Sequence, residues 1–235
     1  MRVVVTRPQL DGERTATALR ARGHEVLVAP LMRVEPIAAN LGGEWGAVVV
    51  TSANAPNAIA DNSARNALIK LPLFAVGRRS AEAARETGFT DVVAANGDVR
   101  DFVRLIATRR ADGNIPLLYL AGEDRAADLL GELSASGIAA ETRVVYRAVT
   151  MPFPPALIEA LEAGEVDIVM HFSRRSADNY VAGAKTAGIA GPALAVRHLC
   201  LSAQVAEPLA NASRIAIAVR PDEATLIELL QVPPA

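Results

Sequence analysis

Val48-Val49-Val50-Thr51-Ser52-Ala53-Asn54 joins an apolar run directly to a group of short polar side chains. Short, nearly continuous apolar runs of this kind are typical of strands buried on both faces of a parallel sheet. Ile168-Val169-Met170-His171-Phe172-Ser173-Arg174 repeats the pattern, and Val3-Val4-Val5 is a further apolar run. Because helix-length segments follow these runs, we predict an α/β fold with parallel sheets and right-handed crossovers.

The segments between the apolar runs are rich in Ala, Leu, Glu and Arg, which favour helix. Several of them stop at a glycine, the residue preferred just after a helix because it adopts positive φ without strain. The clearest predicted helices cover residues 12–22, 81–87 and 126–136, and the glycines that follow them are Gly23, Gly88 and Gly137.

Two sets of five predicted strands match each other in permuted order. One set lies between about residues 45 and 146, and the other comprises about residues 2–6, 25–30, 167–172, 197–201 and 214–219. The stretch from Val48 matches the stretch from Ile168, and Phe74-Ala75-Val76-Gly77 matches Leu199-Cys200-Leu201-Ser202. Residues 117–143 then match residues 3–30, so the end of the central set corresponds to the start of the chain.

The permuted repeat indicates two similar α/β domains, one of them discontinuous. We expect one domain at about residues 1–34 and 152–235, and an inserted domain at about 38–146. Both crossings between them, at about residues 32–37 and 147–155, contain proline and can pair as a two-stranded linker, with a cleft between the domains. The alternative is a single ten-stranded sheet, which is disfavoured because open twisted sheets of that width tend to split.

The composition indicates a globular protein with no strong overall charge. Hydrophobic residues make up 51% of the chain, charged residues make up 21%, and the formal net charge is −2 at pH 7. No global field draws such a chain to nucleic acid or to an anionic membrane. The single cysteine, Cys200, lies in an apolar run and is expected to be buried. Without an apolar run of the length needed for a signal peptide or a membrane span, we expect a cytoplasmic protein.

Motifs for several common chemistries are missing from the sequence. No dinucleotide-type glycine pattern follows a predicted strand, and there is no phosphate-loop Gly-Lys-Ser/Thr or Gly-x-Ser-x-Gly elbow. The three histidines, His24, His171 and His198, have no partner at metal-ligand spacing. We therefore expect neither a metal nor an organic cofactor.

Polar residues gather instead in the turns that follow the predicted strands. Ligands of open α/β sheets bind beyond the carboxyl ends of the strands, where helix N-termini present free N–H groups to anions. The alternative role of each hydroxyl residue is to cap a helix N-terminus. The candidate ligand-binding residues are Thr6, Arg7, Thr51, Ser52, Asn54, Gly77, Arg78, Ser80, Gly122, Ser173, Ser176, Ser202 and Gln204.

Arginines recur in the same turns. Arg7 stands alone, whereas Arg78-Arg79 and Arg174-Arg175 are adjacent pairs. The guanidinium group binds carboxylates and phosphates through two parallel hydrogen bonds. We expect a rim that suits a ligand with several carboxylates or phosphates, the alternative being an ordinary solvated surface.

The sequence resembles the uroporphyrinogen-III synthase family over nearly its whole length. Each matching motif is short, and it is their order along the chain that is specific. The motifs are Val5-Thr6-Arg7-Pro8, Gly23-His24-Glu25-Val26, Pro30-Leu31, Val50-Thr51-Ser52-Ala53-Asn54-Ala55, Ala75-Val76-Gly77, Leu117-Leu118-Tyr119-Leu120-Ala121-Gly122 and Val144-Val145-Tyr146-Arg147.

The resemblance implies two α/β domains joined by a two-stranded linker and an enzyme that needs no cofactor. Such enzymes close linear hydroxymethylbilane, which carries eight carboxylates, into uroporphyrinogen III. The substrate loses its terminal hydroxyl to give an azafulvene cation, and attack by ring D through a spiro intermediate inverts that ring. The implied partners are this substrate and the preceding bilane-forming enzyme, which hands it over, and we expect a monomer.

Family roles carry over to Thr51, Ser52, Ser80, Ser173 and Tyr146. The resemblance implies that the Tyr146 hydroxyl assists departure of the substrate hydroxyl as a general acid. The alternative for Tyr146 is an aromatic side chain that only packs. The family often has Gly-Pro-Thr-Thr where this chain has Ser202-Ala203-Gln204-Val205, so Ser202 or Gln204 is expected to replace the missing polar contact.

Two other classes of function remain open on the residues alone. One is a two-domain binder of an anionic ligand that performs no reaction. The other is a sugar-phosphate isomerase, whose general base would have to be Glu123 or Asp124 in the turn Gly122-Glu123-Asp124-Arg125. Carboxylates are common in the first turn of a helix, which is the simpler explanation of both.

Overall fold

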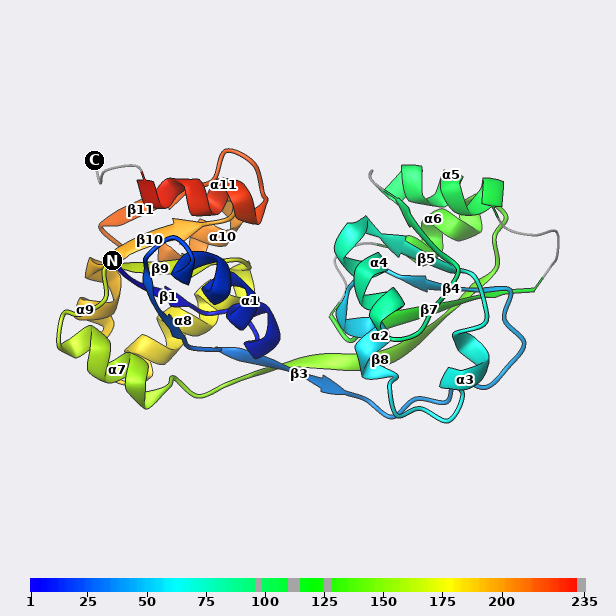
Figure 1. Cartoon of the computed structure of the whole chain (residues 1–235), viewed down its shortest axis with the longest axis horizontal. Coiled ribbons are helices and arrows are strands. Elements are labelled where there is room, and N and C mark those ends of the chain that lie inside the picture. The colour runs from blue at the N-terminus through cyan, green and yellow to red at the C-terminus, as the bar shows by residue number, and fades with distance from the viewer. Residues whose placement is uncertain (96–98, 110–114, 125–127, 232–235) are drawn as a thin grey trace. The chain divides into compact units, whose positions relative to one another are not determined.

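The computed structural model describes residues 1–95, 99–109, 115–124 and 128–231. The chain divides into two compact units (Figure 1). Unit 1 comprises Met1–Arg33 and Val149–Ala235, and unit 2 comprises Val34–Ala148. Each unit contains its own parallel sheet with helices on both faces, and each is described by itself.

The sheet of unit 1 has five strands in the order β11-β10-β9-β1-β2, and all of its neighbouring strands are parallel. The central strands are buried because their apolar side chains point alternately to both covered faces. Val3, Val4 and Val5 are all fully buried. The strands are β1 (Arg2–Val5), β2 (Glu25–Val28), β9 (Ile168–His171), β10 (Arg197–Cys200) and β11 (Arg214–Ile217).

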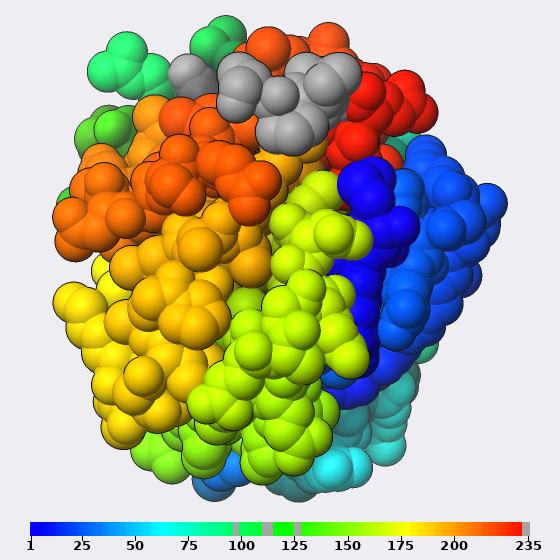
Figure 2. All heavy atoms as spheres, turned by 90° about the vertical axis from the view of Figure 1, so that its left-hand side faces the viewer, coloured from blue at the N-terminus to red at the C-terminus, as the bar shows by residue number. Residues whose placement is uncertain are grey.

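Helices cover both faces of this sheet. One face carries a core with Leu157, Tyr180 and Ala193, and the other a core with Leu19 and Leu226. Figure 2 shows part of unit 1, where the N-terminal segment (blue) lies beside the segment of α7 (yellow-green). The helices are α1 (Gln9–Arg20), α7 (Pro155–Glu162), α8 (Arg174–Thr186), α9 (Ala190–Ala195), α10 (Ala203–Ala206) and α11 (Glu223–Glu228), with short 3₁₀ turns η1 (Glu207–Leu209) and η2 (Leu229–Gln231).

The second sheet has six strands in the order β3-β8-β7-β4-β5-β6, and the four pairs from β8 to β6 are parallel. Its strands are β3 (Met32–Pro36), β4 (Ala47–Val50), β5 (Leu73–Val76), β6 (Val92–Ala95), β7 (Leu117–Gly122) and β8 (Ala140–Thr150). The helices of unit 2 are α2 (Asn54–Ala58), α3 (Arg65–Leu68), α4 (Gly77–Glu86), α5 (Val99–Arg109) and α6 (Leu129–Ala135). Its two cores lie on opposite faces, one around Val48 and Val50 and the other around Val49 and Phe102.

The prediction of an α/β fold with parallel sheets is confirmed, and the alternative of a single sheet is wrong because β1 and β4 belong to different sheets. The order β6-β5-β4-β7-β8 corresponds strand by strand to β11-β10-β9-β1-β2. This is the permuted correspondence that the sequence repeat predicts.

The predicted ends of the helices, taken from the glycines, are closer to the observed ends than the predicted starts, taken from composition, are to the observed starts. Gly23, Gly88 and Gly137 lie two or three residues beyond the last residue of α1, α4 and α6, and their φ of +81°, +101° and +69° is the left-handed conformation that commonly ends a helix. Helix α1 begins at Gln9 rather than at residue 12, and α4 begins at Gly77 rather than at residue 81, because polar first turns hide the start from the apolar pattern. Helix α6 begins at Leu129, where the Asp128 carboxylate accepts a hydrogen bond from the Gly131 N–H at 3.0 Å. Residues 126 and 127 of the predicted helix lie outside the described residues.

Candidate functional site

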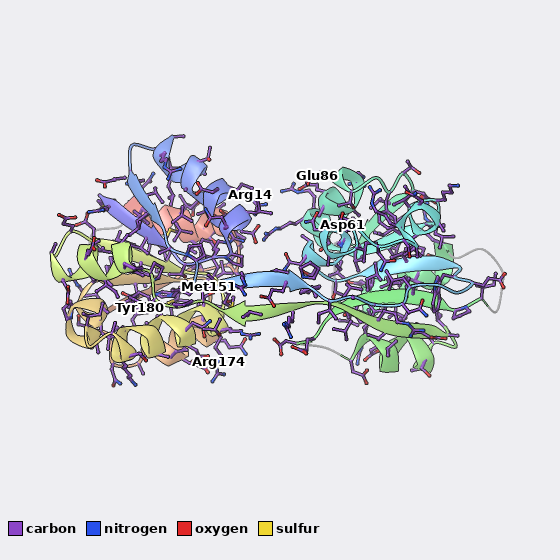
Figure 3. All side chains as sticks on the ribbon, turned by 90° about the horizontal axis from the view of Figure 1, so that it is seen from below. Arg14, Asp61, Glu86, Met151, Arg174 and Tyr180 are labelled. Atoms are coloured by element: carbon purple, nitrogen blue, oxygen red, sulfur yellow. The ribbon has the colours of Figure 1, made fainter. Side chains whose placement is uncertain are left out.

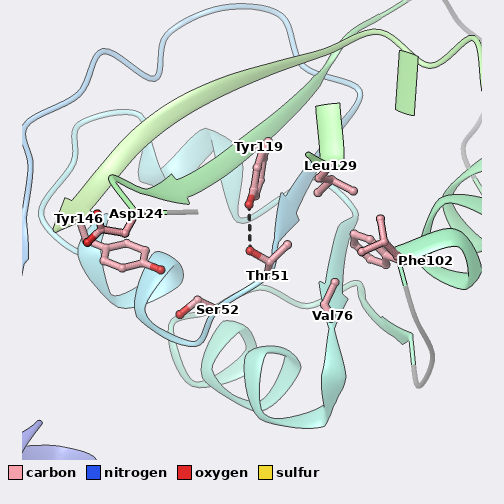
Figure 4. Close-up of a pocket in the computed structure, with 10 residues that line it drawn as sticks. Thr51, Ser52, Val76, Phe102, Tyr119, Asp124, Leu129 and Tyr146 are labelled. Carbon is pink, nitrogen blue, oxygen red and sulfur yellow. Dashed lines mark hydrogen bonds between the residues drawn. The ribbon is translucent and has the colours of Figure 1, made fainter. Parts of the chain in front are cut away.

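A pocket of about 330 Å³ lies in unit 2 beyond the carboxyl ends of the central strands (Figure 4). Polar atoms on its wall come mainly from the turn after β4 and from β7 and β8, and apolar side chains from β5, α5 and α6 form the rest. This position is where open α/β sheets bind ligands. The lining residues are Thr51, Ser52, Val76, Val99, Phe102, Tyr119, Gly122, Asp124, Leu129 and Tyr146.

Thr51 and Tyr119 form the first polar pair in the pocket. The Thr51 Oγ1 and the Tyr119 hydroxyl are 3.0 Å apart, a hydrogen-bond distance (Figure 4). Tyr119 is 4% exposed, whereas Thr51 is exposed. Parallel pairing of Val49 with Tyr119 places both on one face of the sheet, and Thr51 lies two residues further along that face.

Ser52 and Tyr146 form the second polar pair. The Ser52 Oγ accepts a hydrogen bond from the Asn54 N–H at 3.2 Å, which shapes the turn that leads into α2. Burial raises the pKa of the Tyr146 phenol above its usual range, and hydrogen bonding to Ser52 partly opposes the effect. The negative charge of Asp124 nearby and the Tyr119 side chain also raise it. Tyr146 is therefore held in its neutral form, in which it donates a hydrogen bond.

Tyr146 is placed by an irregularity between β7 and β8. Ala121 pairs with Val144, but the next residue, Gly122, pairs with Tyr146, so Val145 is an extra residue in β8. The Glu123 N–H donates to the Tyr146 carbonyl oxygen at 2.9 Å just beyond the shift. Bulges of this kind commonly redirect a side chain next to a binding site.

The pocket combines an apolar wall with hydroxyl groups. Val76, Phe102 and Leu129 offer apolar contact, and the hydroxyls of Thr51, Ser52 and Tyr146 offer hydrogen bonds. Aromatic and apolar walls with a few placed polar groups are typical of small-molecule sites. Of the predicted site residues, the fold brings Thr51, Ser52, Gly122 and Tyr146 together at this pocket.

The other predicted residues of unit 2 do not line the pocket. Asn54 begins α2, and Gly77 begins α4 with φ of +78°. Arg78 is an exposed side chain whose guanidinium lies 3.5 Å from the Glu82 carboxylate on the next turn. Ser80 is 5% exposed and belongs to the buried side of α4.

The side chains of Thr6 and Arg7 have partners inside unit 1. The buried Thr6 hydroxyl donates to the Met170 carbonyl at 3.1 Å. Arg7 is 7% exposed, and its guanidinium lies 2.9 Å from the Glu223 carboxylate and 4.2 Å above the centre of the Phe172 ring. Two strong local partners leave the side chain turned into the domain.

The hydroxyl residues after β9 and β10 act as helix caps. Ser173 accepts from the Ser176 N–H at 3.1 Å, and the two hydroxyls are 2.9 Å apart. Ser202 accepts from the Val205 N–H at 3.4 Å. Ser173 and Ser202 therefore cap α8 and α10, and the Gln204 side chain is exposed at the start of α10.

The predicted arginine rim is only partly exposed. Arg174 lies on the outside of α8 (Figure 3), 2.8 Å from the Glu207 carboxylate and 3.9 Å from that of Asp178. Arg175 is half-buried, and Arg125 lies outside the described residues. Surface ion pairs of this kind are weak and exchange readily, so they do not prevent Arg174 from meeting a ligand carboxylate.

Sequence reasoning missed Tyr119, Phe102, Val76 and Leu129. The one available signal was the hydroxyl of Tyr119 inside an otherwise apolar strand, because a buried phenol needs a hydrogen-bond partner. Phe102 and Leu129 follow the spacing of core residues, and nothing in the sequence separates them from the rest of the core.

Two further features of the described residues concern the requirements of a metal site and of a membrane-spanning helix. No group of three or more His, Cys, Asp or Glu side chains that could hold a metal occurs among the described residues. Within the same part of the chain, none of the helices is long and apolar enough to cross a bilayer.

The model of a family described as Uroporphyrinogen-III synthase HemD matches residues 13–229. The structure is similar to a crystal structure of uroporphyrinogen-III synthetase from Helicobacter pylori, with a TM-score of 0.71, 19% sequence identity, and coverage of 98% of this chain and 99% of that chain. A mutant uroporphyrinogen III synthase from Thermus thermophilus covers 98% of this chain and 97% of its own, with a TM-score of 0.51 and 16% identity. No curated protein matches the chain significantly.

Proposed function

The chain belongs to the uroporphyrinogen-III synthase family, and we propose that it closes linear hydroxymethylbilane with inversion of ring D to give uroporphyrinogen III. The observation that carries this proposal is the family match over residues 13–229. Enzymes of this family are lyases of tetrapyrrole biosynthesis. The family match also disfavours a binder that performs no reaction and a sugar-phosphate isomerase.

The unit 2 pocket is proposed to hold the reacting end of the bilane. Its apolar wall suits the face of a pyrrole ring, and its hydroxyls suit the carboxylates that each ring carries. Holding the two ends of a flexible chain in a reactive geometry lowers the entropic cost of ring closure. In well-oriented reactions this effect lowers the activation free energy by about 7–11 kcal/mol. Thr51 and Ser52 are the proposed hydrogen-bonding residues.

Tyr146 is proposed as the general acid. Its phenol gives a proton to the terminal hydroxyl of the substrate as the carbon–oxygen bond breaks, so that water leaves and a cationic azafulvene forms. The substituted position of ring D attacks the azafulvene carbon to form the spiro intermediate, and the bond from that position to the bridge toward ring C then breaks, which leaves a second azafulvene on ring C. The free position of ring D attacks this second azafulvene carbon and loses its proton, which restores the phenol. A raised pKa makes the Tyr146 phenol a weak acid. We therefore expect it to contribute modestly to the rate, because the electrons of the pyrrole ring drive most of the departure of the hydroxyl.

The remaining contacts are proposed for the other carboxylates of the substrate. They involve one exposed arginine, Arg78, and the polar side chains and backbone of turns that follow the strands, because guanidinium, hydroxyl and N–H groups all bind carboxylates. Thr6 and Arg7 are left out because the fold uses their side chains internally. The proposed set is Asn54, Gly77, Arg78, Ser80, Gly122, Ser173, Ser176, Ser202 and Gln204.

The setting of the reaction is proposed from the family and from the charge of the chain. The net charge of −2 gives no reason to expect nucleic acid or anionic membrane as a partner. We infer a monomeric cytoplasmic enzyme that takes its unstable substrate from the preceding bilane-forming enzyme. No cofactor is expected to take part, so activity should survive exhaustive chelation.

The function is tested by supplying freshly generated hydroxymethylbilane and separating the uroporphyrin isomers after oxidation. The chain should yield the type III isomer faster than the bilane closes on its own. A product that is only the unrotated type I isomer, formed at the spontaneous rate, would show that the chain does not perform this reaction.

A further inference from the structure

Tyr119 is the most buried of the polar residues that line the pocket. The proposed reaction assigns it no part. Its ring belongs to the core around Val49, Phe102 and Leu129, and it is 4% exposed. Such packing fixes the ring in one rotamer. Its hydroxyl therefore lies at a fixed point, 3.0 Å from the Thr51 Oγ1 (Figure 4).

Thr51 is the mobile member of the pair. It is the first residue after β4, its side chain is exposed, and it lines the pocket. An exposed threonine hydroxyl ordinarily rotates among several staggered positions, which costs binding free energy when a ligand selects one of them. The hydrogen bond to a fixed phenol removes this freedom before the ligand arrives.

The chemistry of the two hydroxyls favours one direction of donation. By distance either hydroxyl could be the donor, and the greater acidity of a phenol than of an aliphatic alcohol favours donation from Tyr119 to Thr51. The hydroxyl proton of Thr51 is then directed away from Tyr119. Because Thr51 lines the pocket, this proton can point into it. Accepting one hydrogen bond also makes a hydroxyl a stronger donor in the next one.

We propose that Tyr119 is a positioning residue, whose buried phenol aims the Thr51 hydroxyl proton into the unit 2 pocket, where it donates to a substrate carboxylate. The identity of the ligand rests on the proposed function, whereas the ordering of Thr51 does not. Because the contact to a carboxylate exists in both the ground state and the transition state, its loss should raise KM more than it lowers kcat.

The kinetic test compares Tyr119→Phe, Thr51→Val and the double variant, with hydroxymethylbilane as substrate. Each single variant should raise KM about 3- to 10-fold, the range of one hydrogen bond, and leave kcat within about 2-fold. The double variant should be no worse than Thr51→Val, because Tyr119 acts through Thr51. Thr51→Ser, which keeps the hydroxyl, should restore most of the affinity.

Tyr180→Phe is the matched control. Tyr180 is also a buried tyrosine, but its hydroxyl donates to the Ala193 carbonyl at 3.0 Å within unit 1. Its removal should cost stability and leave KM unchanged. If Tyr119→Phe also left KM unchanged, or if its effect added in full to that of Thr51→Val, the proposal would be overturned.

A second measurement is independent of activity. Three-bond couplings to the Thr51 methyl carbon, measured by NMR without substrate, report the rotamer of this side chain. They should show one rotamer in the wild type and averaging in Tyr119→Phe. Averaging already in the wild type would overturn the proposal even if the enzyme made uroporphyrinogen III. A fixed rotamer in an inactive wild-type protein would instead overturn the proposed function and keep the ordering role of Tyr119.

Discussion

The ring of Tyr146 lies directly against Gly122, the residue paired with it across the irregularity between β7 and β8. A Cβ atom built on Gly122 would be 2.7 Å from the ring Cζ and 2.8 Å from the hydroxyl oxygen. Protein Cβ atoms do not approach other atoms this closely, so the glycine is what allows the ring to occupy its place. Gly122, a predicted ligand-binding residue, thus also determines the position of the proposed general acid.

Gly122→Ala should therefore displace Tyr146. We expect kcat to fall by about 10-fold, close to the effect of removing the hydroxyl, and the free energy of unfolding to fall by about 1–3 kcal/mol because of the steric overlap. Steady-state kinetics and urea unfolding measure the two effects. Gly191→Ala is the control, because no heavy atom outside its own helix turn lies within 4 Å of the added carbon. It should leave kcat unchanged, and wild-type kcat in Gly122→Ala would contradict the positioning of Tyr146 by this glycine.

Tyr146→Phe removes the hydroxyl and keeps the ring. We expect kcat to fall by about 10-fold or more, with a nearly unchanged Tm, because a general acid typically contributes about 10²–10⁴-fold and the substrate itself drives much of this step. The raised pKa also predicts that the wild-type profile of kcat against pH shows no loss from this phenol below about pH 10. Near-normal turnover in a stably folded Phe variant would show that Tyr146 only packs.

The sequence was most informative where one local pattern decides the structure. Buried strands such as Val3-Val4-Val5 need continuous apolar runs, and helix ends need a glycine with positive φ, so both could be predicted. The side-chain partners could not, because they depend on residues far apart in the chain. Arg7 turns inward toward Glu223, 216 residues later, and Thr51 meets Tyr119, 68 residues later.

Arg7→Met should destabilise unit 1 without weakening substrate binding. The guanidinium donates to Thr15 at 3.0 Å and to the Glu223 carboxylate at 2.9 Å, and removing one partner of a buried pair leaves the other charge uncompensated. Breaking a fully buried pair costs about 3–5 kcal/mol of unfolding free energy. We expect a smaller loss here, because the Glu223 side chain is 33% exposed and water can solvate its charge. Thermal unfolding and KM are the measurements. A raised KM with unchanged stability would return Arg7 to the binding site.

Arg78→Ala should show the opposite behaviour. Its side chain is exposed and makes a single surface pair with Glu82, which contributes little to stability. If it holds a substrate carboxylate, KM should rise several-fold with an unchanged Tm, because such a contact is uniform binding. Unchanged KM would identify Arg78 as an ordinary surface residue.

A buried histidine pair should make unit 1 sensitive to acid. His171 Nε2 and His198 Nδ1 are 3.1 Å apart and both rings are fully buried. Burial lowers the pKa of both, that of His198 to about 4, and the proximity of His198 lowers that of His171 further. The unfolded chain then binds more protons than the folded chain between about pH 6.5 and 4, so stability is present above this window and falls as the pH drops through it.

The expected loss for His198 is about 2 kcal/mol of unfolding free energy between pH 7.5 and 5. Urea unfolding at several pH values across this range measures the loss. His171→Gln combined with His198→Gln should flatten the dependence, and His24→Gln is the control because His24 lies outside the pair. An equally steep dependence in the double variant would place the acid sensitivity elsewhere.

The isomer composition of the product decides whether this chain performs the family reaction in the unit 2 pocket. Wild-type protein and the double variant Thr51→Val with Tyr146→Phe are given equal, freshly generated hydroxymethylbilane. The wild type should give predominantly uroporphyrinogen III. The variant, checked for folding by its unfolding curve, should give a larger share of type I from spontaneous closure, because its turnover and its affinity are both lowered. A folded double variant that gives the wild-type isomer ratio at the wild-type rate would show that the reaction does not depend on these pocket hydroxyls.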